Sequence, residues 1–530
     1  MSTARSSLKL SLLTMISRVL GLIRDHFQAV FFGTGPIAVA WEIAYMLPNM
    51  LRNLLAEGSL SQAFIPLYSE SLKQSEEEAK RAAGIVIVVL TIIVSIIVFA
   101  GIIVFPYIIP FYTGKTFEEA QLTILLSQIM FAFILTSSIT AIFAGMENTH
   151  QYFVVPALSP ILLNIVLIGG FLFLLPFSYA GETNAIYLAF SVLAGGLIQL
   201  AFQAYYVYRK GLWPQFSLNF RHPVIIKILT LMGPAVLGAS IFQINQLLDI
   251  AIASYLIEDI RAVPALRFSQ RLIQLPTGII GVALSTAILP SLVRAIRRGE
   301  EKENEKELVS VISFALFLTV PAAIGLYVLG PDIINLIYYG GQWKADSTEA
   351  TWMALQFYCI GVPFYSLNKI LTSSFYAYQD TKTPVRILVI TVFMNLCLNV
   401  ILAPHYAQAG LAISSSITGL INALLLLFLL RNKIKFSFVS LWKRMLVLFP
   451  LWVLLAFFAA LTIYLFEPFR ESTGLMIASF FHSNAVARYS AVLPVLIAAA
   501  GGGLLYLGVA YLLKIKEMDA IRSIVKRKSS

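Results

Sequence analysis

Charged residues are scarce in this chain. Only 12% of its 530 residues are Asp, Glu, Lys or Arg, whereas 58% are hydrophobic. A soluble globular domain carries about 25% charged residues, and a soluble chain of this length would usually fold into several domains. The apolar excess runs from one end of the sequence to the other, so the composition indicates an integral membrane protein.

Signatures of catalysis and of metal binding are also missing. The sequence contains no HExxH, no phosphate-binding loop and no Gly-x-Ser-x-Gly. The 5 histidines have no ligand spacing, and the 2 cysteines, Cys359 and Cys397, are expected to be small core residues. Because the connecting segments are too short for a catalytic domain, we expect a transporter rather than an enzyme.

Apolar runs long enough for a helix to cross a bilayer recur throughout the chain. They are continuous rather than alternating, which argues against transmembrane strands. The sequence therefore predicts an all-α integral membrane fold of about 14 transmembrane helices. The expected spans lie near 10–33, 37–65, 83–112, 120–146, 153–176, 184–209, 225–255, 270–296, 308–338, 348–377, 384–404, 408–431, 441–466 and 488–514.

Basic residues are concentrated in alternate connecting segments. With the N-terminus inside, the expected outer segments hold few of the 38 Lys and Arg residues, namely Lys115, Arg261, Arg267, Lys344, Arg470 and Arg488. Since cytoplasmic loops carry the excess of Lys and Arg, both termini are expected in the cytoplasm. This bias explains the net charge of +11 without nucleic-acid binding, and the basic tail at 514–528 is expected to lie against anionic head groups.

A weak internal repeat divides the sequence. Residues 61–66 (SQAFIP) recur as 285–290 (STAILP), and the same offset carries Asp25 onto Asp249. Short apolar strings also coincide by chance, so this reading stays open. The repeat suggests two six-helix lobes followed by two further helices, and transporters built in this way bind their substrate between the halves.

Four arginines interrupt the apolar spans: Arg18, Arg24, Arg52 and Arg271. Each costs roughly 2.5–3.5 kcal/mol at the bilayer centre on insertion scales. Asp25 and Glu57 are too few to neutralise them, so positive charge is left over. This excess suits an anion-binding cavity, because guanidinium matches phosphate in a bidentate way. Structural ion pairs combined with side chains that snorkel to the interface would also explain these residues.

A second polar cluster is expected from Asp249, Asn395, Asn399 and Ser415. Asn395 and Asn399 are four residues apart and therefore share a helix face. A carboxylate with amide and hydroxyl oxygens suits Na⁺ or a proton-linked carboxylate. Hydrogen bonds between helices are the alternative reading.

Several motifs resemble the MurJ/MviN family of lipid II flippases, within the multidrug/oligosaccharidyl-lipid/polysaccharide exporter superfamily. The resemblance extends to about residue 430. The N-terminal block is specific to this family. The matching strings are SRVLG at 17–21, RD at 24–25, LPN at 47–49, AEG at 56–58, SQAFIP at 61–66, GPA at 233–235 and QDTKTP at 379–384.

The resemblance implies two lobes around a central cationic cavity, 1–221 and 222–435. In 436–530 it implies two helices that form a groove for a lipid tail, followed by the basic tail. It further implies that alternating access moves lipid II, the undecaprenyl-pyrophosphate-linked peptidoglycan precursor, from the inner to the outer leaflet of the bacterial cytoplasmic (inner) membrane for cell-wall synthesis. The other implied partners are membrane lipids and cell-wall synthesis proteins, and the chain is expected to act as a monomer. The alternatives are a flippase for another polyprenyl-linked glycan, a drug exporter of the same superfamily, or a membrane enzyme acting on polyprenyl pyrophosphate.

The resemblance also assigns residues. It places the substrate among Arg18, Arg24, Asp25, Asn49, Arg52, Glu57 and Arg271. It suggests a cation site of Asp249, Asn395, Asn399, Leu411 and Ser415, which would couple transport to Na⁺ or protons; no other cofactor is expected. The chain departs from the family at Gln270 and Gln274, where several members have acids, and at Asn399, where the cation-site version has a carboxylate. Fewer acids leave the cavity more positive, which suits a diphosphate.

Overall fold

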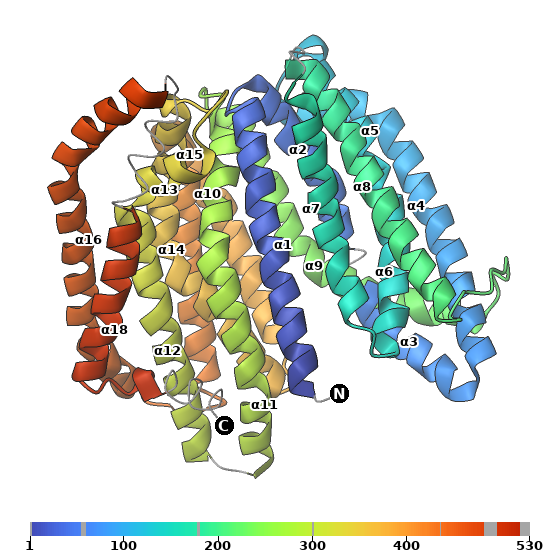
Figure 1. Cartoon of the computed structure of the whole chain (residues 1–530). Coiled ribbons are helices and arrows are strands. Elements are labelled where there is room, and N and C mark those ends of the chain that lie inside the picture. The colour runs from blue at the N-terminus through green and yellow to red at the C-terminus, as the bar shows by residue number, and fades with distance from the viewer. Residues whose placement is uncertain are drawn as a thin grey trace. The chain divides into compact units, whose positions relative to one another are not determined.

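The chain is helical throughout the part that the computed structural model describes, which comprises residues 3–54, 60–176, 181–298, 301–434, 436–481 and 495–519. These residues contain no strand, only an isolated bridge between Gly340 and Trp343. The chain divides into two units, Met1–Tyr255 and Leu256–Ser530 (Figure 1), and each is described by itself.

The first unit is built from nine helices of its described residues. They are α1 Thr3–Phe32, α2 Pro36–Arg52, α3 Leu60–Gln74, α4 Glu76–Thr113, α5 Phe117–Phe131, α6 Phe133–Thr149, α7 Val154–Leu174, α8 Gly181–Arg209 and α9 Pro223–Leu256, whose final residue falls beyond the unit boundary.

The second unit contains the remaining helices, two of them short π-helical segments. They are α10 Ala262–Pro276, η2 Thr277–Gly281, α11 Val282–Arg298, α12 Glu301–Val328, α13 Gly330–Tyr338, α14 Ala345–Ala377, α15 Lys382–Leu430, α16 Phe438–Phe481, η3 Ile497–Gly501 and α18 Gly502–Leu512. α9 packs with the first unit, whereas the predicted boundary between the lobes, at residue 221, lies before this helix. The predicted division into 1–221, 222–435 and 436–530 concerns transport lobes and stays a prediction.

Eight helices of the described residues are long and apolar enough to cross a membrane. They are Glu76–Thr113, Phe117–Thr149, Val154–Leu174, Gly181–Arg209, Ala262–Ile296, Lys302–Val328, Lys382–Leu430 and Phe438–Leu465. Many of their outward side chains are apolar: Tyr107 and Phe111 on α4 are 77% and 80% exposed. Such faces are stable against hydrocarbon, not against water.

Several predicted spans contain interruptions that the apolar pattern did not reveal. α15 covers both 384–404 and 408–431, and its two arms meet at Ala407, where φ is 48° and ψ is −134°. The span predicted at 270–296 begins earlier, at Ala262, and passes through the π-helical turn η2. Because helical breaks need only one or two residues, hydropathy windows smooth them out.

Capping residues fix the turns that join α3, α4 and α5. The Ser75 side chain accepts a hydrogen bond from the Glu78 N–H and begins α4, while Thr116 and Glu119 form a reciprocal capping box at α5. Gly114 ends α4 with φ of 66°, and a Cβ there would lie 3.0 Å from the Tyr255 ring. Glycine suits both the left-handed backbone and the close approach.

An aromatic cluster holds α1 against α2 and α7. Phe32, Trp41 and Phe171 are buried, and the Phe32 ring centroid lies 5.2 Å from that of Trp41 and 6.2 Å from that of Phe171. Burying each ring contributes on the order of 2 kcal/mol. Figure 1 shows α1 alongside α7, and this packing positions the charged half of α1.

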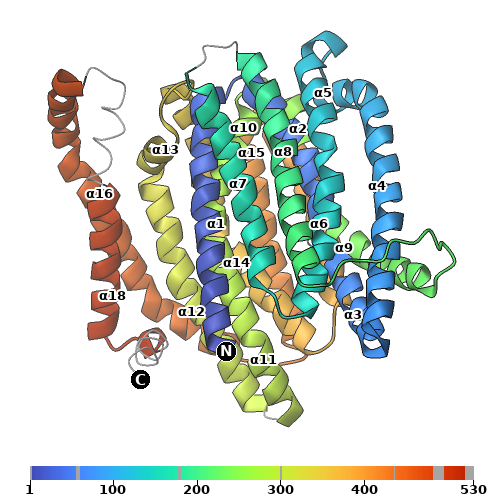
Figure 2. The same ribbon diagram turned by 45° about the vertical axis from the view of Figure 1, so that its right-hand side comes forward.

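A separate cluster attaches the C-terminal helices to α12. Phe317, Leu448 and Tyr506 are buried together, and the Tyr506 hydroxyl donates to the Phe317 carbonyl at 2.8 Å. α16 and α18 lie side by side in Figure 2. The last two predicted spans therefore form a helical pair on the second unit.

Candidate functional site

Arg24 is held in place on α1 by two neighbours. Its Nη2 and Nε donate to Asp25 Oδ1 at 2.6 and 3.1 Å, and its Nη1 donates to Asn164 Oδ1 at 3.1 Å. The Arg24 and Asp25 side chains are only 13% and 8% exposed. Asn164, on α7, also donates to the Ser17 carbonyl at 3.2 Å, so one amide links two turns of α1 and fixes the guanidinium.

Arg18 lies on the same helix but differs from Arg24 in its contacts. It is half-buried and makes no hydrogen bond or ion pair with the described residues of the first unit. A guanidinium that is partly removed from water and lacks a counter-ion attracts anions strongly. The first unit therefore combines Arg24, which Asp25 neutralises, with Arg18, which pairs with none of the described residues of that unit.

A buried acid–amide pair lies close to this part of the chain. Gln28 Nε2 donates to Glu42 Oε1 at 2.6 Å, and both residues are buried. A buried charge is stable only when it is hydrogen-bonded or paired. Glu42 and Gln28 were not among the predicted site residues, although an acid inside an apolar span is itself a signal for function.

Asn49 and Arg52 meet at the end of α2. Arg52 Nη2 donates to Asn49 Oδ1 at 2.8 Å. Asn49 orients the guanidinium without neutralising it, because an amide carries no charge. Glu57, the remaining predicted residue of this block, lies outside the described residues.

Arg271 belongs to the second unit, on α10, where it is half-buried. The helix is anchored nearby, since the Ser269 hydroxyl donates to the Thr351 carbonyl at 2.8 Å and Gln270 Nε2 donates to the Tyr358 hydroxyl at 3.0 Å. These hydrogen bonds attach α10 to α14 and fix the orientation of the helix that carries Arg271.

Two members of the predicted cation site meet within α15. Asn399 Nδ2 donates to Asn395 Oδ1 at 3.1 Å, and Asn395 Nδ2 donates to Thr418 Oγ1 on the other arm at 3.4 Å. Ser415 lies on that arm, and its carbonyl accepts from the Thr418 hydroxyl at 3.1 Å; Leu411, also there, is buried.

Asp249 belongs to the first unit, where its carboxylate accepts from Asn245 Nδ2 at 3.3 Å. Among the described residues no group of three His, Cys, Asp or Glu side chains gathers. The described residues thus bring Asn395 and Asn399 together on α15, and the cation site stays a prediction.

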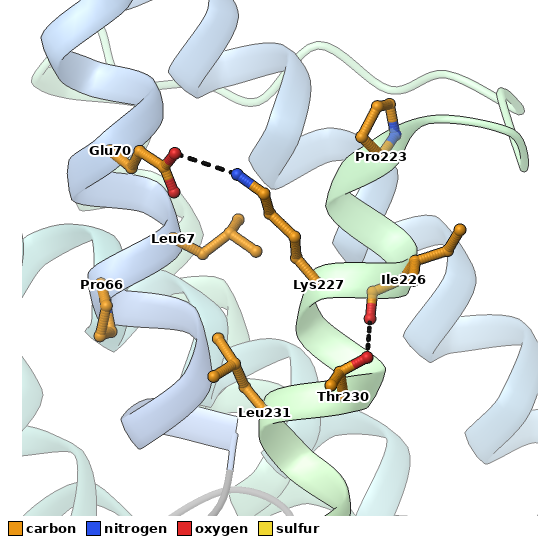
Figure 3. Close-up of a pocket in the computed structure, with 8 residues that line it drawn as sticks. All are labelled: Pro66, Leu67, Glu70, Pro223, Ile226, Lys227, Thr230 and Leu231. Carbon is orange, nitrogen blue, oxygen red and sulfur yellow. Dashed lines mark hydrogen bonds and ion pairs between the residues drawn. The ribbon is translucent and has the colours of Figure 1, made fainter.

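A separate hollow of about 560 Å³ opens between α3 and α9 (Figure 3). Lys227 Nζ pairs with Glu70 Oε1 across it at 3.0 Å, but both side chains are more than half exposed. Exposed pairs of this kind contribute little to stability. None of the arginines discussed above lines this hollow.

The QDTKTP motif forms a structural cap at the start of α15. Asp380 accepts from the Thr383 N–H at 3.0 Å, from the Thr383 hydroxyl at 2.8 Å and from Lys433 Nζ at 3.1 Å. The backbone N–H first, then the hydroxyl and the ammonium, lower the pKa of Asp380 to about 2. The motif therefore begins α15 and attaches it to the segment after its end.

Comparison with known proteins decides the family. The family described as "Lipid II flippase MurJ" matches residues 28–484. The chain belongs to this family of lipid II flippases. A Rhizobium tropici protein named probable lipid II flippase MurJ is 33% identical over 441 residues, which cover 81% of this chain and 79% of that protein.

Solved structures agree with the family. One titled "Lipid II flippase MurJ, inward closed conformation" matches with a TM-score of 0.77 at 27% identity, covering 95% of this chain and 98% of that one. An inward-facing MATE multidrug transporter matches with a TM-score of 0.69 at 16% identity, covering 81% of this chain and 98% of that one. The second likeness shows the fold alone.

Membership in the MurJ family confirms three predictions. The protein is an all-helical, multi-pass membrane protein, it has the fold shared by MurJ and MATE transporters, and it is a transporter rather than an enzyme. The roles of the individual arginines, amides and acids stay predictions.

Asn164 was not among the predicted site residues, although its side chain accepts a hydrogen bond from Arg24. Its signal was a polar amide inside the apolar run at 153–176, and intramembrane polar residues commonly face a partner or a cavity.

Proposed function

We propose that this protein translocates lipid II, or a lipid-linked glycan with the same diphosphate, from the inner to the outer leaflet of the bacterial cytoplasmic membrane. Family membership supports the substrate class. The observation that carries the residue-level proposal is the pair of arginines on α1. Arg24 is fixed by Asp25 and Asn164, and Arg18 has no partner in the described first unit.

The four arginines act on the diphosphate in different ways. Arg18 supplies positive charge that no described residue of the first unit neutralises, whereas Arg24 and Arg52 present guanidinium groups that Asn164 and Asn49 orient. Oriented guanidinium groups bind phosphate oxygens in a bidentate way at low entropic cost. Arg271 supplies a further half-buried guanidinium within the second unit, and alternating access carries the head group across.

The C-terminal helices receive the polyprenyl tail in this proposal. α16 and α18 pack together on α12 and expose apolar residues such as Phe457 and Leu504. A hydrocarbon chain lies favourably on such a surface while the polar head group is carried separately.

Within the second unit, transport couples to Na⁺ at the polar cluster on α15. The amide, hydroxyl and carbonyl oxygens of Asn395, Asn399, Ser415 and Leu411 are the donor types that Na⁺ prefers. Replacing Asn399 with Leu is expected to remove the Na⁺ dependence of thermal unfolding. Unchanged Na⁺ dependence would exclude these residues as the site.

The orientation follows the basic segments, with both termini in the cytoplasm. Cysteine accessibility provides the check. A cysteine at Lys302 should react only with reagents that cross the membrane, whereas one at Lys344 should react with reagents added outside.

Complementation tests the substrate. The resident lipid II flippase of a bacterium is depleted, this chain is expressed, and outer-leaflet lipid II is followed with an externally added probe. Restored outer-leaflet lipid II supports the proposal. If the protein is inserted and abundant while lipid II stays inside, the substrate is another polyprenyl-linked glycan.

Matched variants test the mechanism in the same cells. Arg18→Ala, Arg24→Ala, Arg52→Ala and Arg271→Ala are each expected to abolish transport, and Arg298→Ala, on an exposed helix end, is expected to keep it. Normal transport by all four alanine variants would refute a cationic path.

A further inference from the structure

A small basic hollow lies where α16 begins and α18 ends. Its volume is about 310 Å³, at the lower end of the range for small-ligand sites. It is lined by Ser440, Lys443, Arg444, Val447, Leu513, Lys514, Ile515, Lys516 and Glu517. All of these residues belong to the second unit, and none is used in the proposed transport path.

The charge of the hollow is unbalanced. Four of its lining side chains are cationic and only Glu517 is anionic. Glu517 is buried, and it accepts from Arg444 Nη1 at 2.9 Å, so these two groups neutralise each other. Lys443, Lys514 and Lys516 are exposed, and their ammonium groups make no hydrogen bond or ion pair with the described residues. Three ammonium groups thus remain to attract an anion.

The turn after α18 is built to present two of these lysines. Ile515 is buried against the cluster of α12, α16 and α18, and its N–H donates to the Ala510 carbonyl at 3.0 Å. Lys514 adopts a left-handed conformation with φ of 52°. Since the residue between them is anchored in the core, Lys514 and Lys516 are held at the rim of the hollow.

The surroundings of the hollow are those of a membrane interface. Trp442 and Tyr511 are 63% and 54% exposed, and Val447 and Leu513 in the wall are 56% and 63% exposed. Trp and Tyr gather at the level of lipid head groups, and exposed aliphatic residues beside them favour acyl chains. A soluble anion would gain nothing from this apolar wall.

We propose that this hollow binds the phosphate of an anionic glycerophospholipid, such as phosphatidylglycerol. Lys443, Lys514 and Lys516 contact the phosphate, and Val447 and Leu513 contact the first methylene groups of its acyl chains. The bound lipid links the ends of α16 and α18.

The test uses the full chain purified in a neutral detergent. Native mass spectrometry measures binding of dioctanoyl phosphatidylglycerol and dioctanoyl phosphatidylcholine, with inorganic phosphate as competitor. The variant is Lys443→Gln/Lys514→Gln/Lys516→Gln. The matched control, Lys302→Gln/Lys306→Gln/Lys382→Gln, removes three exposed lysines of the same unit outside the hollow.

Each lysine near an anionic head group contributes about a factor of five in affinity. The triple variant is therefore expected to bind phosphatidylglycerol on the order of 100-fold more weakly, while the control binds as the unaltered chain does. Leu513→Ser should also weaken phosphatidylglycerol binding. Phosphatidylcholine should bind weakly to all variants.

Other outcomes overturn the proposal. Equal loss in the variant and the control would mean a diffuse charge effect, and equal binding of the two lipids would exclude phosphate recognition by charge. Displacement by inorganic phosphate at concentrations equal to the lipid would identify a free-phosphate site. None of these readouts depends on lipid II, so they leave the proposed function untouched.

Discussion

The contrast between Arg18 and Arg24 gives a prediction that separates binding from stability. Arg24→Ala removes the partner of Asp25, whose side chain is 8% exposed. Leaving one member of a buried pair uncompensated costs about 3–5 kcal/mol. Arg18→Ala breaks no interaction within the described first unit, so its effect on stability should stay within about 0.5 kcal/mol. Both variants are expected to lose transport.

The assay pairs unfolding of the purified protein with outer-leaflet lipid II in cells. The double variant Arg24→Ala/Asp25→Ala serves as the control, because it removes the carboxylate together with its partner. It should recover most of the lost stability and still fail to transport. Arg24→Lys should recover transport only in part, since one ammonium cannot reproduce the guanidinium fork that meets both Asp25 and Asn164.

Unfolding of Arg18→Ala as readily as Arg24→Ala would contradict this prediction, because Arg18 would then support the fold. Normal transport by the double variant would also contradict it, because the guanidinium would then be dispensable for the substrate.

Three further predictions concern the scaffold. Gly84→Ala should lower the stability of the protein by about 1–3 kcal/mol, since the added Cβ would lie 2.0 Å from the Gln215 carbonyl oxygen. Gly169→Ala should not lower it, because the space around Gly169 is open. Unfolding of the two purified variants measures the difference. Tyr506→Phe should cost about 1 kcal/mol by removing the hydrogen bond to Phe317, and Tyr464→Phe on the exposed face serves as its control. Asp380→Asn should lower the unfolding temperature at neutral pH. Because the pKa of Asp380 is depressed to about 2 in the folded protein, the difference in unfolding temperature between the variant and the unaltered chain should shrink as the pH falls from about 4 towards 2.

The apolar runs were sufficient to predict the membrane helices, because hydrocarbon demands length and apolarity and little else. They did not reveal the break at Ala407 or the π-helical turn at Thr277–Gly281, because each of these interrupts the α-helix over a short stretch. The helical type of the spans was predicted correctly. Their number was not confirmed, because eight helices of the described residues are long and apolar enough to cross a membrane, against about 14 predicted spans.

The residue types of the candidate site were predictable from the sequence, but which of these residues contact one another was only partly predictable. A helical wheel puts Arg18 and Asp25 on one face, yet they are about 10 Å apart along the axis. The Arg24 side chain instead pairs with Asp25, the next residue in the sequence. A helical wheel, which shows only the directions of the Cβ atoms, does not predict this pair. Asn164 is 140 residues away in the chain, and no local pattern states which helix packs against α1.

The pairing of Arg24 with Asp25 has a consequence for substrate release, given the proposed function. A diphosphate that binds Arg24 must compete with Asp25, so the carboxylate weakens binding and provides a partner to which the guanidinium returns. A hydrogen bond to a charged group contributes about 1.5–3 kcal/mol. Asp25→Asn should therefore bind a soluble prenyl diphosphate about 10- to 100-fold more tightly and transport lipid II more slowly. Calorimetry on the purified protein measures the first effect and the leaflet assay the second. Weaker binding by Asp25→Asn would mean that the carboxylate orients Arg24 for the substrate instead of competing with it.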